Sequence, residues 1–282
     1  MRGLCAVLVL GCALALPPTI AKATGSSFVA ISDVHLDPFT GTDADARLLA
    51  SDVSQWPAIL AGVTLPVATY GSDANVPLLD AILADAARRV PSPDFVVYAG
   101  DSVVHRLAHR VRAVAPGAGQ DPVTDMAVKI TTYLARRLSG TFPDVPVLFA
   151  LGNTDAGCGD YEVEPGGSYL GRTFPTLRAL VGADRLEPDA EATWRAGGYY
   201  AARHPTLDLG PRLSTLFLGH TPAALLAAAN RAALLTDVYV RERPLPRRCT
   251  AKHLSAEVVR ASVVANDLAA VTFIHHNQGS HS

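Results

Sequence analysis

Short apolar runs recur along this chain, and several of them end abruptly in polar residues. The runs are four to seven residues long and are bounded by Gly, Pro, Asp or Ser, which is typical of strands in a buried sheet. They predict five strands, at residues 27–32, 95–98, 145–151, 197–203 and 213–218.

Between these runs, helical spacing of apolar residues and helix-start signals predict helices over residues 72–90 and 121–138. Ser72 and Asp73 are the expected N-cap of the first helix, because Pro77 follows in its first turn. Residues 40–71 hold several turn formers and are expected to be irregular. Strands that alternate with helices predict an α/β fold with a largely parallel central sheet.

The first three predicted strands are each followed by polar residues of one chemical kind. Asp33 and His35 follow the first strand, Asp101 follows the second after a glycine, and Asn153 follows the third after a glycine. The carboxyl ends of parallel strands face a common crevice, so these side chains are expected to meet. Carboxylate, imidazole and amide oxygen suit zinc, manganese or iron better than calcium alone. Each motif alone is more often a turn or a solvated loop, but their shared context favours a metal site.

The N-terminal residues have the features of a secretory signal peptide. A positive start precedes the apolar run 3–16, and Ala21-Lys22-Ala23 supplies a cleavage pattern. Residues 1–23 are therefore expected to be removed after Ala23, which indicates a secreted or periplasmic protein. No later stretch is apolar enough to cross a bilayer, and a net charge of -2 argues against a broad nucleic-acid surface.

Two cysteines, Cys158 and Cys249, follow the predicted cleavage site. An even pair in an oxidising compartment favours a disulfide over two free thiols.

Several longer motifs resemble the successive blocks of calcineurin-like metallophosphoesterases, namely SDVHLDP at 32–38, VVYAGDSVVH at 96–105 and LFALGNTD at 148–155. The sequences YGSDANVPLL, GNTDAGCGDY and GGYYAARHP give a finer resemblance to the acid-sphingomyelinase-like phosphodiesterase branch. The resemblance spans about residues 27–205. It implies a two-sheet β-sandwich flanked by helices, built around two metal ions.

By that resemblance Asp33 and His35 bind the first ion, Asp101 bridges both ions and Asn153 binds the second. Zinc is the expected metal, with manganese or iron as alternatives. A water activated by the two cations would attack phosphorus, so no side-chain nucleophile is required. His105 is the candidate catalytic proton donor, and its alternative role is that of a supporting or surface histidine.

The resemblance weakens toward the C-terminus, where further histidine ligands are expected. Gly219-His220 fits part of that pattern, so His220 is a candidate metal ligand, but the chain has no His-x-His. Thr154 stands where many family members carry a histidine. Residues 24–282 are therefore interpreted as one phosphoesterase domain whose residues 206–282 are atypical or truncated, with a site too incomplete for strong activity.

The sequence thus predicts a secreted metal-dependent phosphoesterase, foremost a sphingomyelinase-like phosphodiesterase acting on a phosphate-ester small molecule or a lipid headgroup. One alternative is a noncatalytic exported protein that binds a phosphate-bearing ligand through a decayed metal site. Another is a phosphomonoesterase or nucleotidase on the same fold. The metal count and turnover distinguish the first two, and the substrate pocket distinguishes the third.

Overall fold

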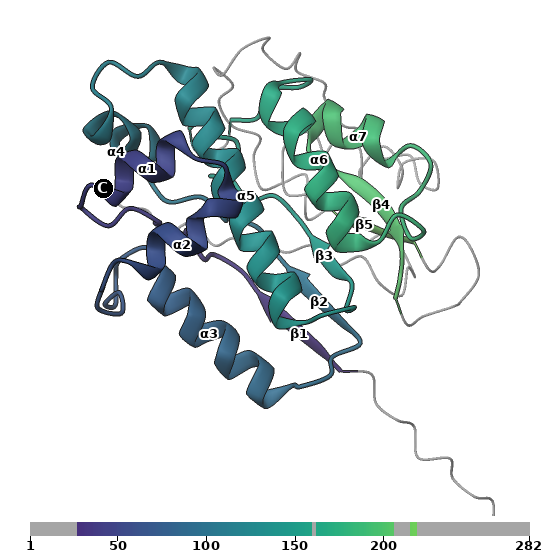
Figure 1. Ribbon diagram of the computed structural model, residues 1–282. Helices are drawn as coiled ribbons and strands as arrows, with labels where there is room; N and C mark the ends of the chain where they lie inside the picture. Colours follow the sequence, from purple (N-terminus) through teal and green to yellow (C-terminus); the bar gives the residue numbers. More distant parts are fainter. Residues whose placement is uncertain (1–26, 160–161, 206–214, 219–282) are drawn as a thin grey trace, which may run out of the picture.

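The computed structural model describes residues 27–159 and 162–205, together with the backbone of 215–218 (Figure 1). Its centre is a parallel sheet of three strands in the order β1 (Phe28–Ile31), β2 (Phe95–Tyr98) and β3 (Val147–Phe149). The predicted α/β class and the three parallel strands are confirmed, although β3 is shorter than the apolar run that predicts it.

The three strands finish at the same level of the sheet. Ile31 pairs with Tyr98, and Tyr98 pairs with Phe149, so the last residue of each strand lies in one row. β2 and β3 are almost wholly buried, as expected of strands packed on both faces, whereas β1 alternates between exposed and buried positions. The residues that follow the strands therefore emerge together at one edge.

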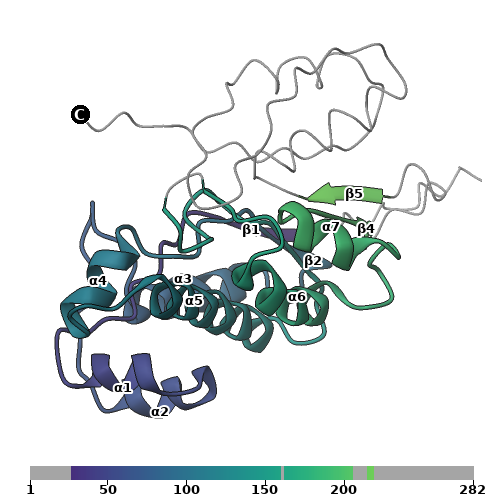
Figure 2. The same ribbon diagram turned by 90° about the horizontal axis from the view of Figure 1, so that it is seen from above.

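Helices α3 (Val76–Arg89), α5 (Gln120–Thr141) and α6 (Ser168–Val181) form a layer against one face of the sheet (Figures 1 and 2). α5 supplies the largest buried stripe, because its apolar residues recur every three or four positions. The predicted helix 121–138 is thus confirmed with slightly wider bounds. α6 was not predicted from the sequence.

The predicted start of the helix over 72–90 is wrong by about one turn. α3 begins at Val76, and its N-cap is Asn75, whose side-chain oxygen accepts the Leu78 N–H at 3.2 Å. Pro77 still lies in the first turn, where a missing N–H costs nothing. Asp73 is therefore not the N-cap that the sequence predicted.

The expectation that residues 40–71 are irregular is wrong for residues 44–61 and confirmed for residues 62–71. They contain α1 (Ala44–Ala50), a 3₁₀ turn at Val53–Gln55 and α2 (Trp56–Ala61). Trp56 is fully buried, and its ring N–H donates to the Leu48 carbonyl at 3.2 Å. Burial of a few large side chains therefore stabilises short helices in this segment, and the turn formers lie in the connections between them. Helices α4 (Leu107–Val114) and α7 (Ala190–Gly197) were likewise not predicted.

A second, antiparallel pair is formed by β4 (Tyr200–Arg203) and β5 (Thr215–Leu218), which confirms the strand character of both predicted segments. Tyr200 is buried, and its hydroxyl accepts the Phe149 N–H of β3 at 3.0 Å. The described residues show no more than these two small sheets, so the two-sheet sandwich stays a prediction.

Several expectations concern residues outside the described ranges: the signal peptide 1–23, the residues 219–282 with His220, and Cys249 as the partner of Cys158. These stay predictions. Across the described ranges, no helix combines the length and apolar character that crossing a membrane would require.

Candidate metal centre

The chain segments that follow β1 and β2 remain paired beyond the sheet. The backbone N–H groups of Asp33, His35 and Leu36 donate to the carbonyls of three successive residues of the second segment, at 3.1, 2.8 and 2.8 Å. An isolated parallel bridge between Leu36 and Val103 continues the pairing. The polar residues at the two strand ends are therefore held side by side by backbone hydrogen bonds.

This pairing brings three of the predicted ligands together. Asp33, His35 and Asp101 each offer a ligand atom, and these atoms all lie within 4.8 Å of one another. Within the described ranges this is the one group of three such side chains with that geometry. Asp33 is exposed whereas His35 and Asp101 are buried, so solvent reaches the cluster at Asp33.

All three side chains project from backbone in the left-handed region, with φ of 54° at Asp33, 43° at His35 and 59° at Asp101. They are three of the five non-glycine residues with positive φ in the described chain. This conformation costs about 1–2 kcal/mol for a residue with a Cβ. It persists only where surrounding hydrogen bonds enforce it, and it often marks a functional site.

The ring of His35 is oriented for a cation. Its Nδ1 lies 3.2 Å from the carbonyl oxygen of Val103. Because a carbonyl only accepts, Nδ1 carries the proton, and Nε2 keeps a lone pair. Burial, followed by the neighbouring His105, lowers the pKa of His35, although Asp101 acts in the opposite direction. The neutral imidazole that a metal requires is therefore favoured.

Two glycines let the second and third strand ends touch. Gly100 has φ of +101°, and a Cβ there would lie 2.3 Å from the backbone nitrogen of Gly152. A Cβ on Gly152 would in turn lie 2.1 Å from Oδ1 of Asp101. Neither position can take a side chain, which confirms that these glycines serve a tight turn and a close backbone approach.

Asn153 lies between two residues that contact Asp101. Gly152 packs so closely against Asp101 that a Cβ would clash with Oδ1. The Thr154 N–H and hydroxyl both donate to the same Oδ1 of Asp101, at 3.0 and 3.2 Å. The side-chain oxygen Oδ1 of Asn153 is buried and has no hydrogen-bond partner among the described residues. A buried, unpaired amide oxygen is costly unless something binds it, and a cation is a suitable partner.

The sequence analysis missed Asp155, which ties the third strand end to the second. Its buried carboxylate accepts four backbone N–H groups at 2.6–3.0 Å, those of Gly152, Asp101, Ser102 and Val103. Burial and the Asp101 carboxylate raise the pKa of Asp155 to about 7, while the N–H groups favour its charged form. An aspartate two residues after Asn153 was the available signal, and its role is to orient the ligand-bearing turns.

The candidate proton donor His105 lies against the cluster. Its ring stacks on that of His35, with centroids 3.9 Å apart and planes 26° apart. His109, four residues further along the chain, is exposed. Asp37 is not in the cluster, because it forms a salt bridge with Arg110 at 3.0 Å and accepts the Phe39 N–H at 3.1 Å. His220, the remaining predicted ligand, lies outside the described residues.

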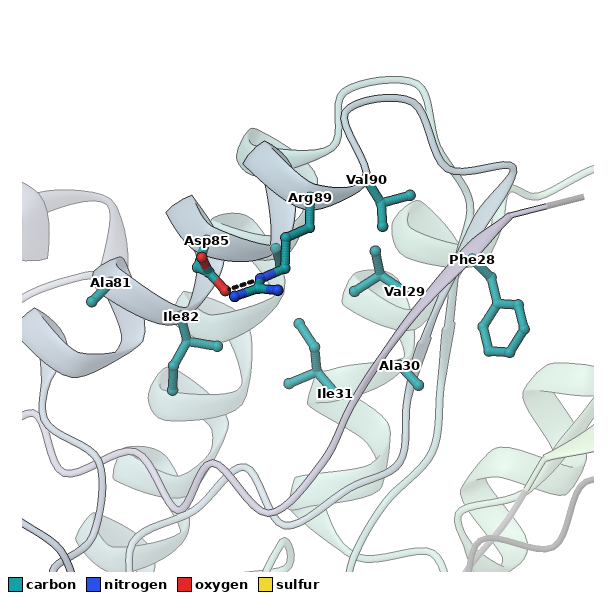
Figure 3. Close-up of a pocket in the computed structure, with 10 residues that line it drawn as sticks. Phe28, Val29, Ala30, Ile31, Ala81, Ile82, Asp85, Arg89 and Val90 are labelled. Atoms are coloured by element: carbon teal, nitrogen blue, oxygen red, sulfur yellow. Dashed lines mark hydrogen bonds and ion pairs between the residues drawn. The ribbon is translucent and has the colours of Figure 1, made fainter.

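A shallow apolar hollow lies elsewhere, between β1 and α3 (Figure 3). It is lined by the four β1 residues and by one side of α3, where Asp85 accepts a hydrogen bond from Arg89 at 2.6 Å. None of the candidate ligands lines it. Among the described residues, the candidate metal ligands therefore gather at the strand ends and not in this hollow.

Comparisons with known proteins support part of the resemblance. No family model matches the chain. The chain is similar to acid sphingomyelinase-like phosphodiesterase 3b of Mus musculus, with 28% identity over 139 residues, which is 49% of this chain and 27% of that protein. It is also similar to sphingomyelin phosphodiesterase A of Dictyostelium discoideum, with 27% identity over 192 residues, 66% of this chain and 29% of that protein.

A third similar protein is sphingomyelinase phosphodiesterase C of Dictyostelium discoideum, with 22% identity over 171 residues, 60% of this chain and 34% of that protein. The chain thus spans only about a third of the length of these relatives. Their names support a distant relationship to sphingomyelinase-like phosphodiesterases.

Proposed function

We propose that this protein is a metal-dependent phosphoric ester hydrolase, foremost a phosphodiesterase. The observation that carries the proposal is the convergence of Asp33, His35 and Asp101 within 4.8 Å, next to a turn whose Asn153 oxygen is buried and unpaired within the described ranges. The names of the similar proteins support the phosphodiester as the bond that is cleaved.

The donor set fits two divalent cations. Asp33 and His35 would hold the first, Asp101 would be shared, and Asn153 would hold the second, with zinc preferred over manganese or iron because imidazole is present. Such ions polarise phosphoryl oxygens and lower the pKa of a bound water. His220 is proposed as a further ligand. Because the chain lacks the His-x-His that the resemblance leads one to expect, the first ion is expected to bind loosely and turnover to be slow.

Each described residue has a distinct task in this proposal. His35 presents the lone pair of Nε2, because Val103 holds its Nδ1 proton. Asp101 is held by Thr154 and by the backbone contact of the two glycines, which fixes the position of the shared carboxylate. His105, stacked on His35, would donate a proton to the leaving oxygen. Substrates would be phosphodiesters of small molecules or lipid headgroups.

The remaining parts of the proposal concern the whole protein. They are export after removal of residues 1–23, a two-sheet sandwich, and a disulfide between Cys158 and Cys249. The resemblance and the composition support them.

The test is metal analysis of the purified protein, combined with hydrolysis of bis(4-nitrophenyl) phosphate after chelation and reloading with zinc or manganese. Two metal equivalents with turnover that is lost in Asp33→Asn would support the proposal. The matched control is His109→Ala, which changes an exposed histidine outside the cluster and should leave both readouts unchanged. One equivalent or none, without turnover, would favour the noncatalytic phosphate-binding alternative.

A further inference from the structure

Asp73, which lies on the loop before α3, reaches across to the segment that follows β2. Its Oδ1 lies 2.6 Å from Nδ1 of the His105 ring, and its Oδ2 accepts the backbone N–H of the same residue at 3.2 Å. Both carboxylate oxygens are thus directed to one histidine. Burial alone would raise the pKa of Asp73, but the hydrogen bond and charge of His105 lower it.

The backbone around Asp73 is attached to the strand end that carries His35. Ala74 donates its N–H to Val34 at 3.4 Å and accepts the N–H of Asp37 at 2.8 Å. Asn75 forms an isolated parallel bridge with Asp37, while its side chain holds the preceding loop through Pro66 and Ala68. The position of the Asp73 carboxylate is therefore set by the same backbone that places the candidate ligand.

The His105 ring needs such a support. Its side chain is 49% exposed, whereas that of Asp73 is 17% exposed, so core packing does not fix the histidine rotamer. Two contacts that orient the ring are the carboxylate on its Nδ1 and the face of His35, whose centroid lies 3.9 Å away. Because Nδ1 is engaged by a carboxylate that can only accept, Nε2 is the nitrogen through which the ring would act on a substrate.

We propose that Asp73 is a positioning residue, which keeps a proton on Nδ1 of His105 and fixes its ring over His35. The ring in its doubly protonated form then delivers the Nε2 proton to the leaving group and is left as the Nδ1–H tautomer. The inference rests on the proposed function. In the reaction, oxygen from water bonds to phosphorus, the phosphorus–oxygen bond to the leaving group breaks, and Nε2–H protonates the departing oxygen. The attacking water releases its proton to solvent, and the ring takes up a proton from solvent, so the step balances.

The first test does not depend on turnover. Long-range ¹H–¹⁵N correlation of the metal-free protein, at a pH where His105 is neutral, should show the Nδ1–H tautomer. Asp73→Asn should shift the signal toward the Nε2–H tautomer, Asp85→Asn should not, and His105→Ala assigns the signal. An Nε2–H tautomer in the unaltered protein would overturn the proposal.

The second test measures hydrolysis of bis(4-nitrophenyl) phosphate and of diphenyl phosphate. Phenol is a weaker acid than 4-nitrophenol, so departure of the phenyl leaving group depends more strongly on a proton donor. Asp73→Asn should lower kcat about 10-fold or more and slow the phenyl ester further, because supporting residues typically contribute 10–100-fold. Asp73→Asn should add nothing in the His105→Ala background, where the backbone N–H contact survives. Equal losses in both backgrounds would mean that Asp73 only ties the loops together.

If no variant hydrolyses either ester, the proposed function fails and with it the catalytic part of this inference. The tautomer measurement then still decides whether Asp73 sets the ring of His105.

Discussion

Strand β1 borders two regions that differ in almost every physical respect. At its carboxyl end, Asp33 and His35 adopt left-handed backbone and lie beside a buried carboxylate. Along its length, Phe28–Ile31 and one side of α3 line an apolar hollow, where Asp85 forms ion pairs with two arginines of its own helix (Figure 3). The first region carries conformational and desolvation costs, and the second carries neither.

That difference shows where function is to be sought in this fold. The hollow is a visible concavity, but Asp85 is the one carboxylate in its lining. The strand ends are compact, yet they gather unfavourable features that only a ligand or a chemical task would justify. We therefore expect substitutions at the strand ends to have large effects on ion binding or stability, and substitutions at the hollow to have small ones.

The largest effect is expected from Asp101→Asn. An amide lacks the charge to hold two cations, so metal-dependent hydrolysis should fall by at least the roughly 10²–10³-fold that loss of one transition-state contact costs. Zinc affinity should fall in calorimetric titration. Asp85→Asn at the hollow is the matched control and should change neither quantity. Near-normal activity of Asp101→Asn at saturating metal would exclude a shared carboxylate.

Gly100→Ala should be strongly destabilising. The added Cβ would meet the Gly152 nitrogen at 2.3 Å, and alanine disfavours φ of +101°. Left-handed strain and overpacking together should cost about 3 kcal/mol or more, measured as a lower midpoint of guanidinium unfolding. Gly41→Ala separates the two causes, because Gly41 also has positive φ but meets no atom within 4 Å. Equal losses in both variants would mean that the backbone contact contributes nothing.

Asp155→Ala should cost about as much, for a different reason. Four backbone N–H groups at the strand ends would lose their acceptor, and one unsatisfied buried group costs about 1–3 kcal/mol, so a loss of about 3 kcal/mol is expected. Urea unfolding measures it. Thr154→Val, which keeps the N–H contact to Asp101 and removes only the hydroxyl, should lose about 1 kcal/mol. If the two variants lost the same stability, the role given to Asp155 would be wrong.

The smallest effect is expected from Ile82→Ala at the hollow. Ile82 is 36% exposed, so its truncation should lower the free energy of unfolding by no more than about 1 kcal/mol and leave zinc binding unchanged. Weaker zinc binding in this variant would show that the two sides of β1 are coupled, which would remove the distinction made here.

The strands and the cluster at their ends could be predicted because both depend on local patterns. An apolar run of strand length predicts a buried strand, and parallel strands direct their following residues to one edge. The short helices between residues 40 and 71 could not be predicted, because they depend on tertiary contacts. An example is the contact between Trp56 and Leu48, which leaves no periodic pattern in the sequence. Asp73 and Asp155 were missed for a related reason, since each acts on a partner more than 30 residues away.

The left-handed backbone of the three clustered ligands has a consequence for how an ion would exchange. A site whose ligands are already oriented needs no folding step to receive a cation, so its loading rate should be set by loss of water from the ion. The ligand atoms stand within 4.8 Å of one another, so like charges are crowded there until an ion arrives. Release of ordered water would then drive association, and calorimetry should report a favourable entropy with a heat capacity change too small for a coupled folding event.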